Sequence, residues 1–280
     1  MKRFLLGLLV FVIVAGAAAL LLVPTVGSQY RLWREADAVQ AYRSTVSRLD
    51  TLDCGTLLAQ ARNANGEMKG IALQDPWSEG DAPRGNPGAQ ALDVADNGVI
   101  AVLEIPKLGA TVPVLRTFDA ASLEKGAVHL PVTSLPVGGE STHCVLAGQG
   151  DGRFLDPVNG LDRLIPGDCF YVEALQDTLI YEVSESLILA PSELDALTLD
   201  RKADQCTLIA APSEDERLVV RAMRIGRRQT PLEDDTQVLP GWAARLIFAA
   251  PLALAGLIVL ALIEGLRRAA TRRRRNRMQL

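Results

Sequence analysis

The sequence predicts a mainly β domain that follows an amphipathic helix and lies between two transmembrane helices. Three patterns in the 280 residues support this prediction. Seven short runs rich in Val, Ile, Leu and Tyr follow one another between residues 99 and 225, apolar residues recur every three or four positions between residues 30 and 60, and an uncharged apolar run lies near either end. Short strands separated by Gly, Pro, Asn or Asp are typical of a closed barrel or a sandwich.

The two apolar runs are each about as long as the hydrocarbon core of a bilayer is thick. Residues 4–23 contain no charge, and twenty helical residues rise about 30 Å. Residues 246–263 are eighteen further uncharged residues. They predict an N-terminal transmembrane helix or signal anchor at 1–24 and a second transmembrane helix at 246–263. The small residues AGAAA in the first run also allow a cleaved signal peptide.

Basic residues indicate the orientation of these helices. Lys2 and Arg3 precede the first run, and seven arginines lie in the tail 264–280. Positively charged flanks stay in the cytoplasm, so both termini are expected there and residues 24–245 on the outer side of the cell membrane. The net charge of the chain is −4. The basic tail is therefore expected to lie at anionic lipid, which makes the membrane a partner and nucleic acid not one.

Two segments of different composition precede the strands. The spacing of apolar residues predicts an amphipathic helix at 25–63. Residues 64–97 are rich in Gly and Pro and poor in apolar side chains, which is typical of a disordered loop or a functional lid. Asp75, Pro76 and Trp77 form its one segment suited to docking, because an exposed Trp in a polar loop usually fills a pocket.

The strands are expected in a domain at 98–228, followed by a linker at 229–245. We expect strands near 99–105, 112–115, 141–148, 169–174, 179–189, 206–211 and 217–225, and short helical turns near 119–125, 160–164 and 192–197. The chain has four cysteines without a CxxC spacing and only two histidines. No metal site and no cofactor are therefore predicted.

Several segments of this domain resemble the sortases, most closely the class C, pilus-assembling sortases of Gram-positive bacteria. The segments are AVLEIPKLGATVPVL (101–115), SLEKGAVHLPVTSLPVGGESTHCVLAG (122–148), LDRLIPGDCFYV (161–172) and RLVVRAMRI (217–225). The two-span layout and the DPW segment at 75–77 are similar to class C as well, in which an Asp-Pro-aromatic lid plugs the active site. The resemblance implies a closed eight-stranded β-barrel. It also implies a transpeptidase in which a Cys thiolate attacks the Thr–Gly bond of an LPxTG-type signal and a pilin Lys resolves the thioester.

The catalytic positions depart from the family pattern. The resemblance puts Gln149 where the family has a His, Ala211 where it has a Cys, and Arg217 at the family Arg. Alanine offers no nucleophile, and an amide does not titrate near neutral pH. Removing one member of a catalytic triad costs hydrolases on the order of 10⁴ to 10⁶ in turnover. Arg217 is thus the one catalytic residue that matches the family pattern.

Other nucleophiles and bases are poorly placed to replace the missing groups. Cys206 precedes Ala211 by five residues on the same predicted strand, which corresponds to roughly 16 Å and to the opposite face. Ser213 is nearer but has no evident base, and His143 is expected to be structural. Cys144 lies on a neighbouring strand of the implied barrel, so Cys144 and Cys206 are expected side by side, as two buried thiols rather than as a disulfide.

The sequence therefore predicts a catalytically inactive class C sortase-like membrane protein of the Gram-positive cell surface. Its expected partners are pilins, LPxTG-type sorting signals or an active sortase, in pilus or surface-protein assembly. The alternative is an active transpeptidase-like enzyme with a relocated nucleophile. A third hypothesis is a surface protein that is itself sorted, because the LPG at 239–241 and the LPVTS at 130–134 imitate sorting signals. The first lacks Thr-Gly and the second lies within the domain, which disfavours this hypothesis.

Overall fold

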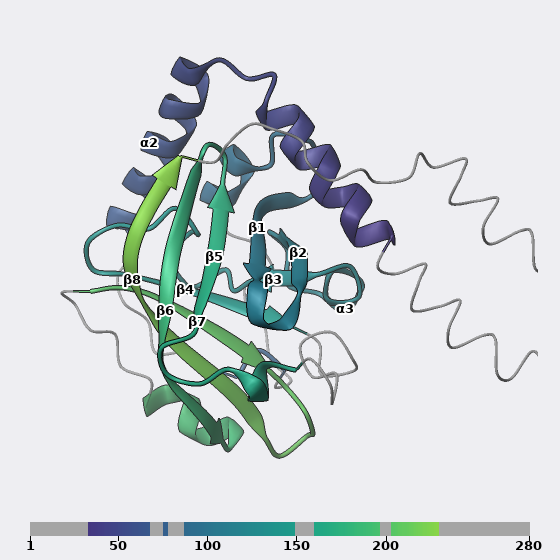
Figure 1. The fold of residues 1–280 in the computed structure, drawn as a ribbon, viewed down its shortest axis with the longest axis vertical. Helices are drawn as coiled ribbons and strands as arrows, with labels where there is room; N and C mark the ends of the chain where they lie inside the picture. Colours follow the sequence, from purple (N-terminus) through teal and green to yellow (C-terminus); the bar gives the residue numbers. More distant parts are fainter. Residues whose placement is uncertain (1–32, 68–74, 78–86, 149–159, 197–202, 230–280) are drawn as a thin grey trace, which may run out of the picture. The chain divides into compact units, whose positions relative to one another are not determined.

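Eight strands form a closed barrel, in the order β1-β2-β3-β4-β7-β8-β6-β5 (Figure 1). The computed structural model describes residues 33–67, 75–77, 87–148, 160–196 and 203–229. The strands are β1 (Val99–Ile105), β2 (Ala110–Leu115), β3 (Ala127–His129), β4 (Thr142–Gly148), β5 (Cys169–Ala174), β6 (Asp177–Leu189), β7 (Asp204–Ala210) and β8 (Arg217–Gln229). β2 pairs with β3 and β4 with β7 in parallel, and the other pairs are antiparallel. The eight-stranded barrel that the resemblance implies is confirmed.

Seven of these eight strands follow the sequence prediction to within a few residues. β3 is the exception, because three buried residues are too short a run to predict a strand from sequence. β7 ends at Ala210. The sequence prediction, which includes Ala211 in this strand, is therefore wrong by one residue there.

In the part of the chain that the structure describes, five short helices lie before or between the strands. They are η1 (Pro87–Leu92), η2 (Pro106–Leu108), α3 (Ala120–Leu123), η3 (Leu161–Arg163) and η4 (Pro191–Ala196). α3, η3 and η4 coincide with the predicted helical turns. η1 lies in the Gly- and Pro-rich stretch, yet its Ala89 and Leu92 are fully buried in the core. Two apolar anchors thus order a segment whose composition favours disorder.

The predicted helix at 25–63 is interrupted. Residues 33–46 are helical, and a second helix, α2, covers Thr51–Glu67. The break falls just before Asp50, whose side chain accepts the N–H of Leu52 (3.4 Å) and whose carbonyl accepts the N–H of Cys54 (3.0 Å). Asp is a favoured residue at a helix start for this reason. The break turns Leu52 outward, with 78% of its surface exposed, although its spacing continues the apolar stripe.

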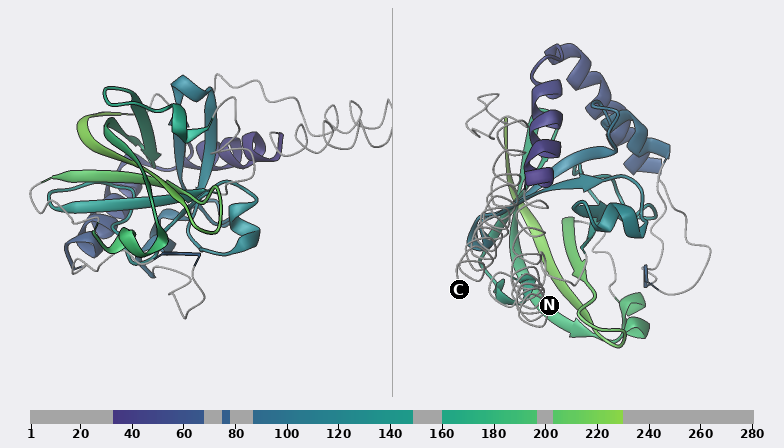
Figure 2. Two further views of the ribbon diagram at one scale, coloured as in Figure 1. Left: turned by 90° about the horizontal axis from the view of Figure 1, so that it is seen from below. Right: turned by 90° about the vertical axis from the view of Figure 1, so that its right-hand side faces the viewer.

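Both helices pack against one end of the barrel (Figure 2). Tyr42 is fully buried there, donates its hydroxyl to the carbonyl of Ile100 (3.1 Å) and accepts the N–H of Leu175 (2.9 Å). One side chain thus links the first helix to β1 and to the turn between β5 and β6. Burial raises the pKa of the Tyr42 hydroxyl well above its ordinary value, so it stays a neutral donor.

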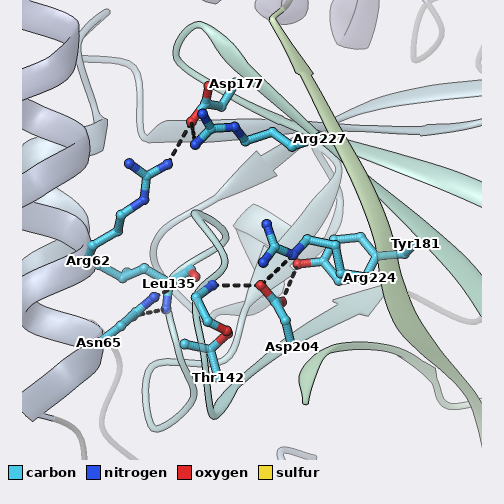
Figure 3. A network of polar contacts seen from close by, with 10 residues as sticks. Arg62, Asn65, Leu135, Thr142, Asp177, Tyr181, Asp204, Arg224 and Arg227 are labelled. Atoms are coloured by element: carbon cyan, nitrogen blue, oxygen red, sulfur yellow. Dashed lines mark hydrogen bonds and ion pairs between the residues drawn. The ribbon is translucent and has the colours of Figure 1, made fainter. Parts of the chain in front are cut away.

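α2 is attached to the barrel by polar contacts from its last turns (Figure 3). Arg62 pairs with Asp177 at 2.6 Å, and Arg227 of β8 reaches the same carboxylate at 3.4 Å. Asn65 donates to the carbonyl of Leu135 (3.1 Å) and accepts its N–H (2.6 Å). Because the amide of Asn65 satisfies both backbone groups of a buried residue, the loop before β4 is held in one position.

Asp204, at the start of β7, joins three further parts of the barrel (Figure 3). Its carboxylate accepts the N–H of Gly139 (2.6 Å), the hydroxyl of Tyr181 in β6 (3.0 Å) and Nε of Arg224 in β8 (2.8 Å). The adjacent Gly138 has φ of +65°, and a Cβ there would lie 2.7 Å from a carboxylate oxygen of Asp204. The close approach of this turn to β7 therefore requires glycine.

The predicted membrane spans at 1–24 and 246–263 lie outside the described residues, as do the tail at 264–280 and the linker beyond residue 229. Within the described ranges, no helix combines the length and the apolar character needed to cross a bilayer.

Candidate active site

The end of β7 and the start of β8 meet beside a second apolar cluster, outside the barrel core. This outer cluster consists of Leu115, Leu123, Val128, Leu130, Val145, Ala147, Leu194, Ile209 and Val219. Residues of β7 and β8 alternate between the core and the outer cluster. Arg217 has the same parity as Val219, so alternation directs its side chain to the face of the outer cluster. Ala211 directly follows the end of β7.

Arg217 is the most heavily bonded side chain of this region. Its Nη1 donates to the carbonyls of Ser213 (2.8 Å), Glu214 (3.2 Å) and Glu216 (2.8 Å), which closes the turn at 212–216. Its Nε and Nη2 donate to the two carboxylate oxygens of Asp75 at 2.7 and 2.9 Å. This two-pronged pair is buried, with side chains 5% and 7% exposed. Charge-assisted, bidentate bonds of this kind are among the stronger contacts in proteins.

The rest of the DPW segment (residues 75–77) lies over the same guanidinium. The ring centre of Trp77 is 5.2 Å from Cζ of Arg217, within cation–π range. Trp77 also meets Phe118 edge to face, with ring centres 6.0 Å apart, and packs on the outer cluster. The structure thus brings together Asp75, Trp77 and Arg217, which lie up to 142 residues apart in the chain. Phe118 is a contact residue that the sequence analysis does not single out.

The structure describes the position of the family nucleophile, Ala211, but not that of the family base, Gln149. Ala211 is half-buried at the end of β7 and contributes a methyl group. Gln149 lies outside the described residues. β4 and β7 pair in register up to Gly148 and Ala210, so Ala211 directly follows the last paired residue of β7.

The thiols of the barrel lie on the other face of these strands. Cys144 and Cys206 are direct register partners on β4 and β7, both buried in the core as free thiols. Burial, together with the neighbouring Cys144, raises the pKa of Cys206 well above its ordinary value. A neutral thiol inside the core is a poor nucleophile. The expected side-by-side placement of the two thiols is confirmed, and both lie in the barrel core.

Both histidines are buried and engaged in the fold. His143 meets the hydroxyl of Thr207 through Nε2 at 2.6 Å, and His129 meets the carbonyl of Ser134 at 2.9 Å. Burial lowers the pKa of each imidazole to about 4. The hydroxyl of Ser213 lies on an exposed turn residue. Neither imidazole is thus presented beside it as a base.

The LPVTS segment at 130–134 is part of the fold. Leu130 is buried in the outer cluster, and the hydroxyl of Thr133 donates to the Leu130 carbonyl (2.8 Å) and accepts the N–H of Val145 (3.1 Å). A segment engaged in this way is not presented as an extended sorting signal. The LPG at 239–241 lies outside the described residues.

Comparisons with known proteins match the barrel. A family model described as the sortase domain matches residues 103–225. Among solved structures, the chain is similar to sortase C of Streptococcus pneumoniae, with 27% identity, a TM-score of 0.63, and coverage of 70% of this chain and 99% of that one. Sortase C1 of group B Streptococcus pilus island 1 matches with 28% identity, a TM-score of 0.61, and coverage of 72% and 98%. No curated protein matches the chain.

Sortase C-1 from Actinomyces oris has a higher identity. It is 35% identical with a TM-score of 0.53, over 62% of this chain and 98% of that chain. The closed eight-stranded barrel and the family model, which covers it from β1 into β8, agree with this identity. We conclude that this chain belongs to the sortase family and is similar to its class C members.

Proposed function

We propose that this protein is a catalytically silent class C sortase homologue that acts at the cell surface by binding. The observation behind the proposal is Ala211, a methyl group at the end of β7 where the family pattern has a cysteine. Arg217 beside it is engaged through all three nitrogens by Asp75 and the turn at 212–216. Acyl transfer needs a nucleophile and donors aimed at the developing oxyanion. The described residues supply neither in this arrangement.

The location is part of the proposal. The two predicted spans would hold residues 24–245 on the outer side of the membrane. The S. pneumoniae relative is described in terms of pilin substrate specificity. By analogy we propose a pilin, an LPxTG-type sorting signal or an active sortase as the partner here. A ligand entering beside Arg217 would have to displace Asp75 and Trp77.

A cleavage assay tests the silent site. Full-length protein in detergent is incubated with a fluorogenic LPxTG-type peptide, next to an active class C sortase as positive control. We expect no turnover above background. We also expect Ala211→Gly and Gln149→Ala to change nothing, because neither side chain can act as nucleophile or base.

Turnover lost in either variant would overturn the proposal. Turnover that survives both, together with labelling by a serine- or cysteine-directed probe, would instead support the alternative of a relocated nucleophile. Binding is tested separately, by capturing pilins and active sortases with the full chain. The amount captured should differ between Arg217→Ala and the unchanged protein. It should be the same for Lys107→Ala, the control, which changes an exposed residue that pairs with Asp168.

A further inference from the structure

β6 has one edge that is only partly paired. β5 covers it from Asp177 to Glu182, and that ladder ends with two bonds at Val183: the N–H of Gly167 to its carbonyl (2.9 Å) and its own N–H to Asp168 (2.8 Å). On its opposite edge, β6 stays paired with β8 as far as Leu189 (Figure 1). No described strand pairs with the first edge from residue 185 to residue 189.

A hollow of about 440 Å³ lies beside this part of β6. It is lined by Asp162, Leu164, Ile165, Pro166, Glu185, Ser186, Leu187, Ile188 and Leu218. Four consecutive residues of β6 take part. Successive side chains of a strand point to opposite faces, so the four do not share one face. Lining residues 162–166 come just before Gly167 and Asp168, which bond to Val183 on the partly paired edge. The space therefore lies where an added strand would run.

The hollow is apolar and open to solvent. Ile165 and Ile188 are 57% and 66% exposed, and they are two of the four large hydrophobic side chains exposed among the described residues. Gathering of exposed aliphatic side chains at one place is typical of an interaction site, whereas single ones are ordinary. Leu218 belongs to the core cluster, on the opposite face of β8 from Arg217. The hollow is thus separate from the candidate active site.

The charges at the rim are acidic. Asp162 and Glu185 line the hollow, and none of the described lining residues is basic. Arg221 pairs with Glu185 at 2.6 Å, but that carboxylate side chain stays 40% exposed. A cationic ligand is favoured over an anionic one at this rim.

We propose that the edge of β6 at 185–189 binds an extended peptide segment of a partner protein that carries an aliphatic side chain next to a lysine or arginine. The segment adds a strand to the sheet and forms main-chain hydrogen bonds with β6. Its aliphatic side chain enters the hollow and its cation meets Asp162 and Glu185. Five residues at about 3.3 Å each give room for roughly five residues of ligand. The proposal does not depend on whether the site at Arg217 is silent.

Binding of a defined peptide tests this surface. The probe is a fluorescein-labelled Thr-Lys-Leu-Lys-Val-Thr, measured by anisotropy with the full chain in detergent. We expect saturable binding that weakens at least tenfold when both lysines are replaced by glutamate. Because only alternate N–H groups of an added strand face its partner, we expect one of two peptides N-methylated at odd or at even positions to lose binding and the other to keep it.

Variants locate the peptide on the protein. Ile188→Lys should weaken binding at least tenfold, and Asp162→Asn severalfold. The matched control is Ile225→Lys, which changes a similarly exposed isoleucine (58%) on β8 that does not line the hollow and should leave affinity within twofold. Urea unfolding of each variant checks that folding is unchanged, as expected for exposed positions. Amide hydrogen exchange should show new protection at residues 184–189 when the peptide is bound.

Three results would overturn the proposal. They are absence of saturable binding, equal loss in Ile188→Lys and Ile225→Lys, and loss in Arg217→Ala with retention in Ile188→Lys. The last would move the peptide to the candidate active site.

Discussion

Arg217 and Asp75 form an ion pair that is almost closed to water, and Trp77 covers it from one side. Removing one partner of a buried pair leaves the other charge unpaired, which costs about 3–5 kcal/mol, whereas an exposed pair contributes about 1 kcal/mol or less. The pair joins the DPW segment to the turn at 212–216 through a single guanidinium. The two parts of the site are therefore expected to lose order together.

Asp75→Ala should lower the free energy of unfolding by about 3 kcal/mol. The measurement is urea unfolding of the full chain in detergent. Lys107→Ala is the control, because it breaks the exposed Lys107–Asp168 pair (2.7 Å) and should cost about 1 kcal/mol or less. Equal costs for the two variants would contradict a structural role of the Asp75–Arg217 pair.

The two buried histidines predict a dependence of stability on pH. Burial holds the pKa of His129 and His143 at about 4, below the ordinary 6.5. Between pH 6.5 and pH 4 the unfolded chain therefore binds more protons than the folded one, so stability is full above pH 6.5 and falls as the pH drops. Each pKa unit corresponds to about 1.4 kcal/mol.

Urea midpoints at pH 7, 6 and 5 measure this loss. His143→Gln should flatten the pH dependence by up to one proton, since one of the two groups is removed. A midpoint that stays constant from pH 7 to pH 5 in the unchanged protein would contradict the prediction.

At the scale of elements, the parallel pairing of β4 with β7 buries two of the four cysteines. The register puts Cys144 opposite Cys206 inside the core, while Cys54 is buried where α2 packs. Cys169, at the start of β5, is the one thiol in the described ranges that is not fully buried. Access of a reagent follows exposure and thiolate fraction.

One thiol per chain, Cys169, should react quickly with a disulfide reagent in the native protein, and the other three only on unfolding. Cys169→Ser should remove the fast phase and leave the slow one. Fast loss of three or four thiols in native protein would show that the core pair is accessible after all.

The contribution of Asp204 to stability can be tested by a single substitution. Its carboxylate connects β7 to β6, to β8 and to the turn at Gly139. Asp204→Ala leaves three donors without their acceptor, at about 1–3 kcal/mol for each buried donor that stays unpaired. We expect a loss of roughly 3 kcal/mol or more in urea unfolding. Asp215→Ala, on an exposed turn, should stay within about 0.5 kcal/mol.

At the scale of the whole molecule, the predicted topology has the barrel on the outer side of the membrane and both termini in the cytoplasm. In a Cys169→Ser background, which removes the one accessible native thiol, a cysteine added after Leu280 should react with a membrane-impermeant maleimide only after permeabilisation of whole cells. A cysteine in place of Asp215, on the exposed β7–β8 turn, should react in intact cells. Labelling of the C-terminal cysteine in intact cells would contradict the predicted orientation.

Part of the fold was predictable because buried side chains recur along a strand or helix with the period of that element. Alternating or continuous apolar runs mark seven strands, and the spacing at Val39, Tyr42 and Val46 marks the buried face of the first helix. β3 has only three residues, too few to show a period. In η1 only Ala89 and Leu92 are buried in the core, and two residues show no pattern either. The helix break before Asp50 depends on the capping of the next helix by this residue, which the spacing of apolar residues does not reveal.

The sequence by itself determined which chemical groups the site can contain: an alanine at 211, a glutamine at 149 and an arginine at 217, since side-chain chemistry needs no structure to be known. Only the tertiary structure decided where those groups and their neighbours lie. The bond between Asp75 and Arg217, the meeting of Cys144 with Cys206, and the unpaired edge of β6 all depend on which distant segments pair and in what register. That pairing is set by the packing of every element at once, and no local stretch of sequence encodes it.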